Sequence, residues 1–268
     1  MTKKTTLVSI SSKGSQGNAQ SNSPVTSADR RYVAFTSDAK TLVAGDTNGK
    51  SDVFVRDRVT GTTKRISVNS GGVQRSHWSQ SDAISADGRY VVFTSETDDV
   101  LCYENATSVF VYDSVTGTTT MVSWSPDSTV WFSSGGRISA DGLYVAYSSL
   151  NVFSDHGENA WVHDRGTGTT TGIGHVASDN EGSRPDAISA DGRYVAFTSG
   201  FSLVSGDWNN ATDVFVYDRK TGNITGVRIS PGGSSGGLDT STLEFYDQRR
   251  RALCGVSIRK HQAGCRGH

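Results

Sequence analysis

Two loops of the sequence carry side-chain oxygens at a spacing that suits a hard cation. They are GDTNGKSD and GDWNNATD, and their oxygen-bearing positions are Asp46, Asn48, Asp52, Asp207, Asn209 and Asp213. Alternating carboxylate and amide oxygens on a tight loop are ligands that Ca²⁺ prefers. Both loops lack an oxygen side chain at the fifth position, and loops rich in Asn, Asp and Gly are also ordinary turns. Ca²⁺ is therefore the one candidate cofactor, and the alternative is that both loops are ordinary turns that bind no metal.

Tryptophans that interrupt an otherwise repetitive sequence form a second set of candidates. Aromatic rings on the loops of a rigid scaffold can bind sugars or peptides, although the same rings can also pack between structural elements. These candidates are Trp78, Trp124, Trp131 and Trp208. No catalytic residue is predicted, because the sequence has no HExxH, no G-x-S-x-G and no phosphate-binding loop. The cluster Asp155, His156 and Glu158 is a weak acid–base signal, because neighbours on one loop rarely point at one atom.

Four internal repeats must position these candidates. A motif of the form SADGRYVAFTS starts at Ser27, Ser85, Ser139 and Ser189, so its aspartates lie 58, 54 and 50 residues apart. A second motif of the form DVFVYDRVTGTT follows each time. The repeats run near 27–68, 85–123, 139–176 and 189–229. This period is the size of a supersecondary unit, so we expect one domain over residues 1–246.

Each repeat has the pattern of short antiparallel strands. Runs such as YVAFTS and DVFVYD are rich in β-branched and aromatic residues, and no segment has the 3.6-residue apolar spacing of a helix. Both faces of YVAF are apolar, which suits a sheet packed between two others. Stacked four-stranded sheets with this period predict an all-β fold, the β-propeller.

Aspartates recur at two positions of every repeat. Asp accepts backbone hydrogen bonds in turns, and a nearby Gly adopts positive φ, so we assign these residues to the turns between strands. They are Asp29, Asp87, Asp141, Asp191, Asp57, Asp113, Asp164 and Asp218. A residue that every blade needs is structural, so function is expected where the repeats differ.

The repeat resembles that of the TolB-like propellers, relatives of the WD-type repeat. The shared pattern is S-x-D-G-x-x-[IV]-A-F-x-S, then D-[IV]-[FY]-V-x-D and T-x-x-[IV]-S, and it covers residues 5 to about 230. The resemblance implies a periplasmic or secreted binding scaffold, or the propeller that gates a peptidase. The catalytic domain of such peptidases has no counterpart in this sequence.

Composition and charge exclude several classes of protein. The chain has 26 Lys and Arg against 27 Asp and Glu. Six of the basic residues and one acidic residue lie in 247–268, so residues 1–246 carry −6 and give no electrostatic reason to expect nucleic acid. No apolar run approaches the roughly 18 residues of a membrane span, and MTKKTTLVSISSKG lacks the apolar core of a signal peptide. The compartment is therefore left open, and we expect a monomer.

Residues 247–268, DQRRRALCGVSIRKHQAGCRGH, do not fit the repeat. A basic arm or a cysteine metal site would explain them poorly, because aromatics are absent and the two cysteines do not form a CxxC pair. Synonymous codons for this segment, read one nucleotide later, can encode ISADGRYVAF, then S and LVAGDT. Arg249, Arg250 and Arg251 then become Ala, Asp and Gly. We expect a fifth repeat unit translated out of frame, so that the tail as written lacks strand-forming sequence.

The chain start matches the end of a repeat, since TTLVSISS at Thr5–Ser12 resembles TTKRISVN at Thr62–Asn69. We therefore expect four intact blades, an N-terminal strand that would close the ring, and a disrupted fifth unit. The expected function is a non-catalytic scaffold that binds a protein, peptide or glycan through loops at one face. The alternatives are a propeller hydrolase or lyase, or the accessory propeller of a peptidase. A fragment of a longer protein, inactivated by the frame change, is a third reading.

Overall fold

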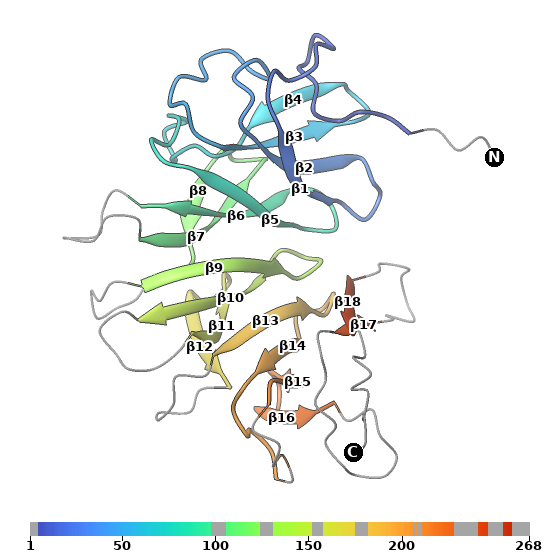
Figure 1. Cartoon of the computed structure of the whole chain (residues 1–268), viewed down its shortest axis with the longest axis vertical. Coiled ribbons are helices and arrows are strands. Elements are labelled where there is room, and N and C mark those ends of the chain that lie inside the picture. Colours follow the sequence, from blue (N-terminus) through green and yellow to red (C-terminus); the bar gives the residue numbers. More distant parts are fainter. Residues whose placement is uncertain are drawn as a thin grey trace, which may run out of the picture.

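The computed structural model is an array of four antiparallel sheets, stacked one after another along the molecule (Figure 1). It describes residues 5–97, 106–123, 131–151, 158–174, 182–205, 207, 211–227, 241–245 and 254–258. Within these ranges every regular element is a strand. Each large sheet has four strands in chain order, so each is one blade of a propeller. The predicted fold class is confirmed.

The strands of the four blades have closely similar lengths. Blade 1 contains β1 (Ser21–Thr26), β2 (Tyr32–Ser37), β3 (Asp52–Asp57) and β4 (Thr62–Arg65). Blade 2 contains β5 (Ser79–Ile84), β6 (Tyr90–Glu96), β7 (Thr107–Asp113) and β8 (Thr119–Met121). Blade 3 contains β9 (Trp131–Ile138), β10 (Tyr144–Asn151), β11 (Asn159–Asp164) and β12 (Thr169–Ile173). Blade 4 contains β13 (Ser183–Ile188), β14 (Tyr194–Ser199), β15 (Asp213–Asp218) and β16 (Asn223–Gly226).

Each blade begins one strand earlier than the repeat unit inferred from sequence. The first strands precede the SADG motif, and neighbouring first strands lie against one another, β1 with β5, β5 with β9 and β9 with β13. They therefore line the axis of the propeller. Segments such as SNSPVT and SRPDAI are polar and contain Pro, so they lack the β-branched pattern that identifies strands in a sequence.

The core lies between blades rather than within one of them. At the first interface, small aliphatic side chains of blade 1, such as Ala34 and Val53, pack against Phe93 and Phe110 of blade 2. Those two rings stack with centroids 5.4 Å apart. Blade 4 presents the equivalent pair, Phe197 and Phe215, to blade 3. Both faces of the inner strands are thus apolar because a blade within the array has a neighbour on either side.

The turns of adjacent blades interlock through a repeated set of contacts, which we call the turn lock. The alanine N–H of one SAD turn donates to the equivalent alanine carbonyl of the next blade, from Ala28 to Ala86 (2.9 Å), Ala86 to Ala140 (3.1 Å) and Ala140 to Ala190 (3.0 Å). A tyrosine of each blade also covers the glycine of the next turn. A Cβ on that glycine would lie 2.0–2.2 Å from the ring in the pairs Tyr32–Gly88, Tyr90–Gly142 and Tyr144–Gly192. Only glycine fits there.

The N-terminal segment forms no strand of a sheet, so the expectation of a strand at Thr5–Ser12 was wrong for the described residues. Residues 8–17 instead repeat the contacts that residues 66–75 make with blade 2. Ile10 bridges Gln16 as Val68 bridges Gln74. Ser12 exchanges hydrogen bonds with Thr63, as Ser70 does with the equivalent residue of β8. The segment therefore occupies the place of a linker from a preceding blade, without that blade's outer strand.

Two strands lie beyond blade 4. They are β17 (Ser241–Phe245) and β18 (Cys254–Ile258), which pair only with each other among the described strands, and β18 lies against β13 (Figure 1). The expectation that the tail has no strand was therefore wrong. CGVSI contains β-branched Val and Ile in alternation, which suffices for a short strand when a partner is available.

Candidate functional site

The two ends of the blades differ in how strictly they repeat. One end, the turn end, holds the tight turns between first and second strands and between third and fourth strands. The opposite end, the loop end, holds the connections between second and third strands and the linkers between blades. The turn end repeats nearly the same residues in every blade, whereas the loop end varies in length and sequence. Side chains that act on a ligand are therefore sought at the loop end.

The recurring aspartates all lie at the turn end and hold the turns. In the first turns, Oδ1 of the aspartate accepts hydrogen bonds from the serine two residues before it and from the N–H two residues after it, at Asp29, Asp87, Asp141 and Asp191. In the second turns, the aspartate accepts from the N–H two residues after it, at Asp57, Asp113, Asp164 and Asp218. These carboxylates are occupied within the fold.

Three of the second-turn aspartates also form bidentate ion pairs that sequence reasoning missed. The guanidinium of Arg89 donates to both carboxylate oxygens of Asp113, at 3.0 and 2.8 Å. This pairing lowers the pKa of Asp113 to about 2. The same pairs join Arg31 to Asp57 and Arg193 to Asp218. The signal was present in the repeats, because an arginine follows the SAD turn in three blades and blade 3 has Leu143 instead.

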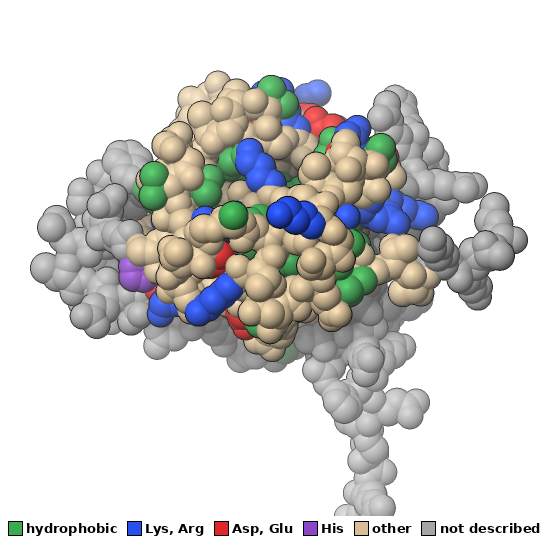
Figure 2. All heavy atoms as spheres, turned by 90° about the horizontal axis from the view of Figure 1, so that it is seen from above, with side chains coloured by type: hydrophobic (Ala, Val, Ile, Leu, Met, Phe, Trp, Pro, Cys, Tyr) green, Lys and Arg blue, Asp and Glu red, His purple; other side chains and the backbone are tan. Residues whose placement is uncertain are grey.

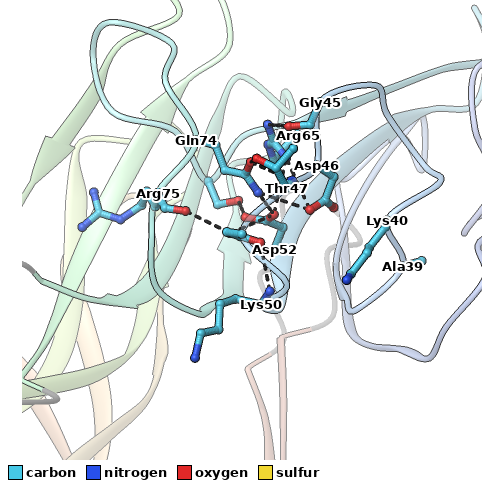
Figure 3. Close-up of polar contacts among 12 residues, drawn as sticks. Ala39, Lys40, Gly45, Asp46, Thr47, Lys50, Asp52, Arg65, Gln74 and Arg75 are labelled. Carbon is cyan, nitrogen blue, oxygen red and sulfur yellow. Dashed lines mark hydrogen bonds and ion pairs between the residues drawn. The ribbon is translucent and has the colours of Figure 1, made fainter.

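The first predicted cation loop forms an internal polar cluster at the loop end of blade 1 (Figure 3). Asp52 is fully buried, and its Oδ1 accepts from the Ser67 hydroxyl at 2.5 Å. Its Oδ2 accepts from the amide of Gln74 at 2.9 Å and lies 3.5 Å from Nη1 of Arg65. The amide of Gln74 also donates to Asp46 at 3.2 Å.

Hydrogen-bond donors therefore surround the carboxylates of this cluster, and all but the Ser67 hydroxyl are nitrogen atoms. Asn48, the third predicted ligand, directs its NH₂ group toward Asp52 (3.4 Å) and the carbonyl of Arg75 (2.9 Å). Burial raises the pKa of Asp52, while Arg65 opposes that shift. A cation would have to displace a buried guanidinium and turn two amides around. The geometry favours a structural ion pair, and Ca²⁺ at this loop stays a prediction.

The second predicted cation loop lies partly outside the described residues. Trp208 and Asn209 fall outside them, whereas Asp207 and Asp213 fall within, with Asp213 opening β15 as Asp52 opens β3. Within the described part of the chain, no three His, Cys, Asp or Glu side chains gather into a set that could hold a metal. Ca²⁺ at this second loop likewise stays a prediction.

Trp78 is the one predicted ligand-binding tryptophan whose side chain the structure describes. It lies at the loop end of blade 2, where its indole N–H donates to Oε1 of Glu96. Oε2 of the same carboxylate lies 2.8 Å from Nδ1 of His77. The Glu96 side chain is 12% exposed and that of His77 39%. We call Trp78, His77 and Glu96 the Trp78 cluster: a buried carboxylate that holds two aromatic rings at the surface.

Arg75 lies beside this cluster and holds the end of β6, which carries Glu96, in place. Nε of Arg75 donates to the Ser95 hydroxyl at 3.0 Å, and Nη2 donates to the Glu96 carbonyl at 3.1 Å. Its guanidinium also lies 4.1 Å above the ring of Phe110. Rings held in this way lose little conformational freedom on binding, which suits stacking against a sugar or a peptide side chain.

The other predicted aromatic and acidic candidates are less informative. Trp124, Asp155 and His156 lie outside the described residues, and Trp131 opens β9. Glu158 accepts hydrogen bonds from Ser148 (2.5 Å) and Arg184 (2.7 Å), so it ties blade 3 to blade 4.

A charged row along the propeller axis was not anticipated from the sequence. Asp82 on β5, Arg137 on β9 and Asp186 on β13 lie on successive first strands. Burial raises the pKa of Asp82 to about 6, and the carboxylate accepts from the Thr94 hydroxyl at 2.6 Å. Nε of Arg137 donates to the carbonyl of Asp186 at 2.9 Å, and its charge lowers the pKa of both carboxyls against the effect of burial. The only sequence signal was DAIS, which occurs twice.

The fold is shared with propellers of several proteins. Putative TolB from Agrobacterium tumefaciens is 18% identical, with a TM-score of 0.51 over 78% of this chain and 66% of that one. A prolyl endopeptidase is 14% identical, with a TM-score of 0.54 over 84% of this chain and 31% of that one. The propeller domain of the Trilobed protease from Pyrococcus furiosus is 14% identical, with a TM-score of 0.50 over 82% and 61%.

These likenesses show a β-propeller fold, which the propellers of TolB and of the two peptidases share. This chain spans less than two thirds of the length of each of those proteins. No protein-family model and no curated protein matches the sequence. Among the described residues, no helix is long and apolar enough to cross a membrane.

Proposed function

We propose that the chain is a non-catalytic propeller scaffold that binds a peptide or a glycan at its loop end, with the Trp78 cluster as the central contact. The observation that carries this proposal is the pairing of the Trp78 indole and the His77 imidazole with one carboxylate, Glu96. The pairing holds a partly exposed indole and a partly exposed imidazole in fixed positions directly before β5. The recurring aspartates of the turn end already accept hydrogen bonds within their own turns.

The proposal can be tested by titration with defined ligands. We would follow tryptophan fluorescence and amide shifts while adding neutral oligosaccharides, uronic-acid oligosaccharides and a random peptide library. Trp78→Ala should weaken any ligand found by at least about tenfold, in the range of aromatic anchor residues. Val115→Ser is the matched control, because Val115 is 72% exposed at the turn end. Equal loss in both variants, or shifts confined to the turn end, would refute the assignment.

A second candidate is the accessory propeller of a peptidase. The match to a prolyl endopeptidase favours it, because that match covers 84% of this chain but only 31% of the other. Under both candidates the chain alone should not turn over a prolyl p-nitroanilide peptide or a polyuronate. Turnover that is lost in His77→Ala would replace the scaffold proposal with a catalytic one.

A further inference from the structure

The turn lock is complete at three interfaces and half-made at the end of blade 4. The N–H of Ala190 has no hydrogen-bond partner among the described residues, whereas the N–H groups of Ala28, Ala86 and Ala140 each reach the next blade. Tyr194 is 36% exposed, while the equivalent tyrosines of blades 1 to 3 are covered by the following turn. The donor and the ring of a fourth lock are therefore in place without an acceptor.

The sheet of blade 4 also carries the side chains that receive another blade. Ala196, Val214 and Val216 occupy the register positions that Ala34, Val53 and Val55 occupy at the first interface. In blade 1 these small side chains accommodate the two stacked phenylalanines of the next blade. Ala196 and Val214 are buried in the structure, so the unfilled part of the surface lies at the turn end, around Tyr194.

Blade 1 differs at the residue on which such a lock depends. Its turn reads SADR, and Arg30 stands where the other blades have Gly88, Gly142 and Gly192. Arg30 keeps the positive φ of that position, 61°, and is exposed. In the other three turns a Cβ would come within 2.0–2.2 Å of the preceding tyrosine ring. No tyrosine can therefore pack on blade 1 in this way.

The opposite face of blade 1 is closed by the chain itself. Phe35 and Phe54 are buried, with 2% and 0% exposed, although no described sheet packs on this face of blade 1. Ala39 and Leu42 of the β2–β3 connection pack on these rings, and Gly17 of the N-terminal segment packs in turn on Ala39 and Leu42. Figure 2, which looks onto this end of the molecule, shows Lys and Arg side chains spread over a mainly polar surface. A polar, self-covered end is the property of a capping repeat.

We propose that the array is directional: blade 1 is its cap, and the turn end of blade 4 is a docking surface for one further repeat unit with glycine after S-A-D. Continuity with the three existing interfaces supports this occupant. A second copy of the chain does not fit, because the blade it would offer carries Arg30. The shifted reading of residues 247–268 supplies the required turn, since Arg251 becomes the glycine of SADG. This inference does not depend on the ligand proposed for the loop end.

The test adds a blade of known sequence. In one variant, residues 228–268 are replaced by a second copy of residues 175–227, and hydrogen exchange is followed residue by residue. We expect exchange at the N–H of Ala190 to slow by at least about tenfold relative to the unaltered chain, because it gains an acceptor. The N–H groups of Ala86 and Ala140, which already have acceptors, serve as internal references in every variant.

A matched variant changes the copied Gly192 of the added unit to Arg, as at position 30. We expect it to lose the protection at Ala190 while Ala86 and Ala140 stay protected. Equal protection with glycine and arginine would overturn the proposal, and so would no protection from the added unit while the references are intact. Sedimentation of the unaltered chain tests the second-copy alternative. Self-association that protects Ala190 would also overturn the proposal.

Discussion

At the scale of single residues, the charged groups fall into two electrostatic classes. The carboxyls at the turn end lie beside arginines and backbone N–H groups, which stabilise the ionised form. The carboxyls on the axis are desolvated, which destabilises the ionised form. The two classes must therefore respond to pH in opposite directions.

The acid response can be isolated with Arg89→Leu, which copies the residue that blade 3 has at this position. The folded pKa of Asp113, about 2, lies below its unfolded value of about 3.9, so the pair stabilises the fold above pH 4 and is lost toward pH 2. We expect the variant to be only slightly less stable than wild type at pH 7, since Arg89 is 39% exposed and solvent screens its charge.

The measurement is urea unfolding of both proteins at pH 7 and pH 2.5. The difference between wild type and variant should shrink at the lower pH, where Asp113 is largely neutral in the unfolded chain. An unchanged difference would show that the pair does not contribute through charge.

Asp82→Asn should have the opposite pH dependence. A carboxyl with a raised folded pKa favours the fold at low pH, and this contribution is lost as pH rises through about 6. The neutral amide avoids that loss, so we expect the variant to gain up to about 3 kcal/mol relative to wild type at pH 7.5. The gain should vanish at pH 4, and chemical unfolding at both values measures it. A gain of the same size at pH 4 would contradict the charge-based explanation.

At the scale of elements, the turns do more than reverse the chain. The glycines of the first turns combine a positive φ with contact to a neighbouring blade, whereas those of the second turns have only the positive φ. Glycine is thus required in the first turns for both backbone conformation and packing, and in the second turns for backbone conformation alone. The distinction separates local strain from packing between blades.

Gly142→Ala and Gly117→Ala form a matched pair for this distinction. Their φ values are 76° and 75°, but a Cβ at Gly142 would lie 2.1 Å from the Tyr90 ring, while nothing lies within 4 Å at Gly117. We expect Gly117→Ala to cost about 1 kcal/mol of unfolding free energy and Gly142→Ala at least about 3 kcal/mol. Thermal unfolding monitored by circular dichroism would compare them, and equal losses would show that the turn lock carries no packing energy.

At the scale of the whole molecule, each blade is stabilised mainly by its contacts with the adjacent blades. The described core clusters join one blade to the next, and the remaining one covers the outer face of blade 1. Such arrays behave as a chain of units coupled through their interfaces. For blade 1, contacts with the N-terminal segment then take the place of contacts with a neighbouring blade and stabilise it.

Removal of residues 1–18 should therefore weaken blade 1 more than blade 3. Hydrogen exchange at the N–H groups of β2 should accelerate by more than about tenfold, while exchange in β10 should change less. Removal of residues 1–4 alone is the control and should leave both unchanged. Uniform acceleration in all blades would indicate one cooperative unit instead.

The sequence predicted what repeats and missed what does not. The β-branched second and third strands and the Asp and Gly turns recur four times, so the blades could be counted in advance. The first strands escaped because polar residues and proline replace the usual pattern along an axis. The Trp78 cluster was found only as a single tryptophan, since Glu96, the carboxylate that joins its two rings, lies 18 residues further along the chain, at the end of β6. Contacts between distant segments leave no local pattern in a sequence.

The hydrogen bonds of the turn lock all point the same way along the chain, from the N–H of one blade to the carbonyl of the blade that follows it. During synthesis on the ribosome, blade 1 emerges first, and every later blade then packs on a blade that has already folded. Synthesis can thus proceed as templated growth, in which each new sheet is ordered by its predecessor before the next one emerges. Under this order of events, a sequence change confined to the last unit would leave the blades made earlier correctly folded.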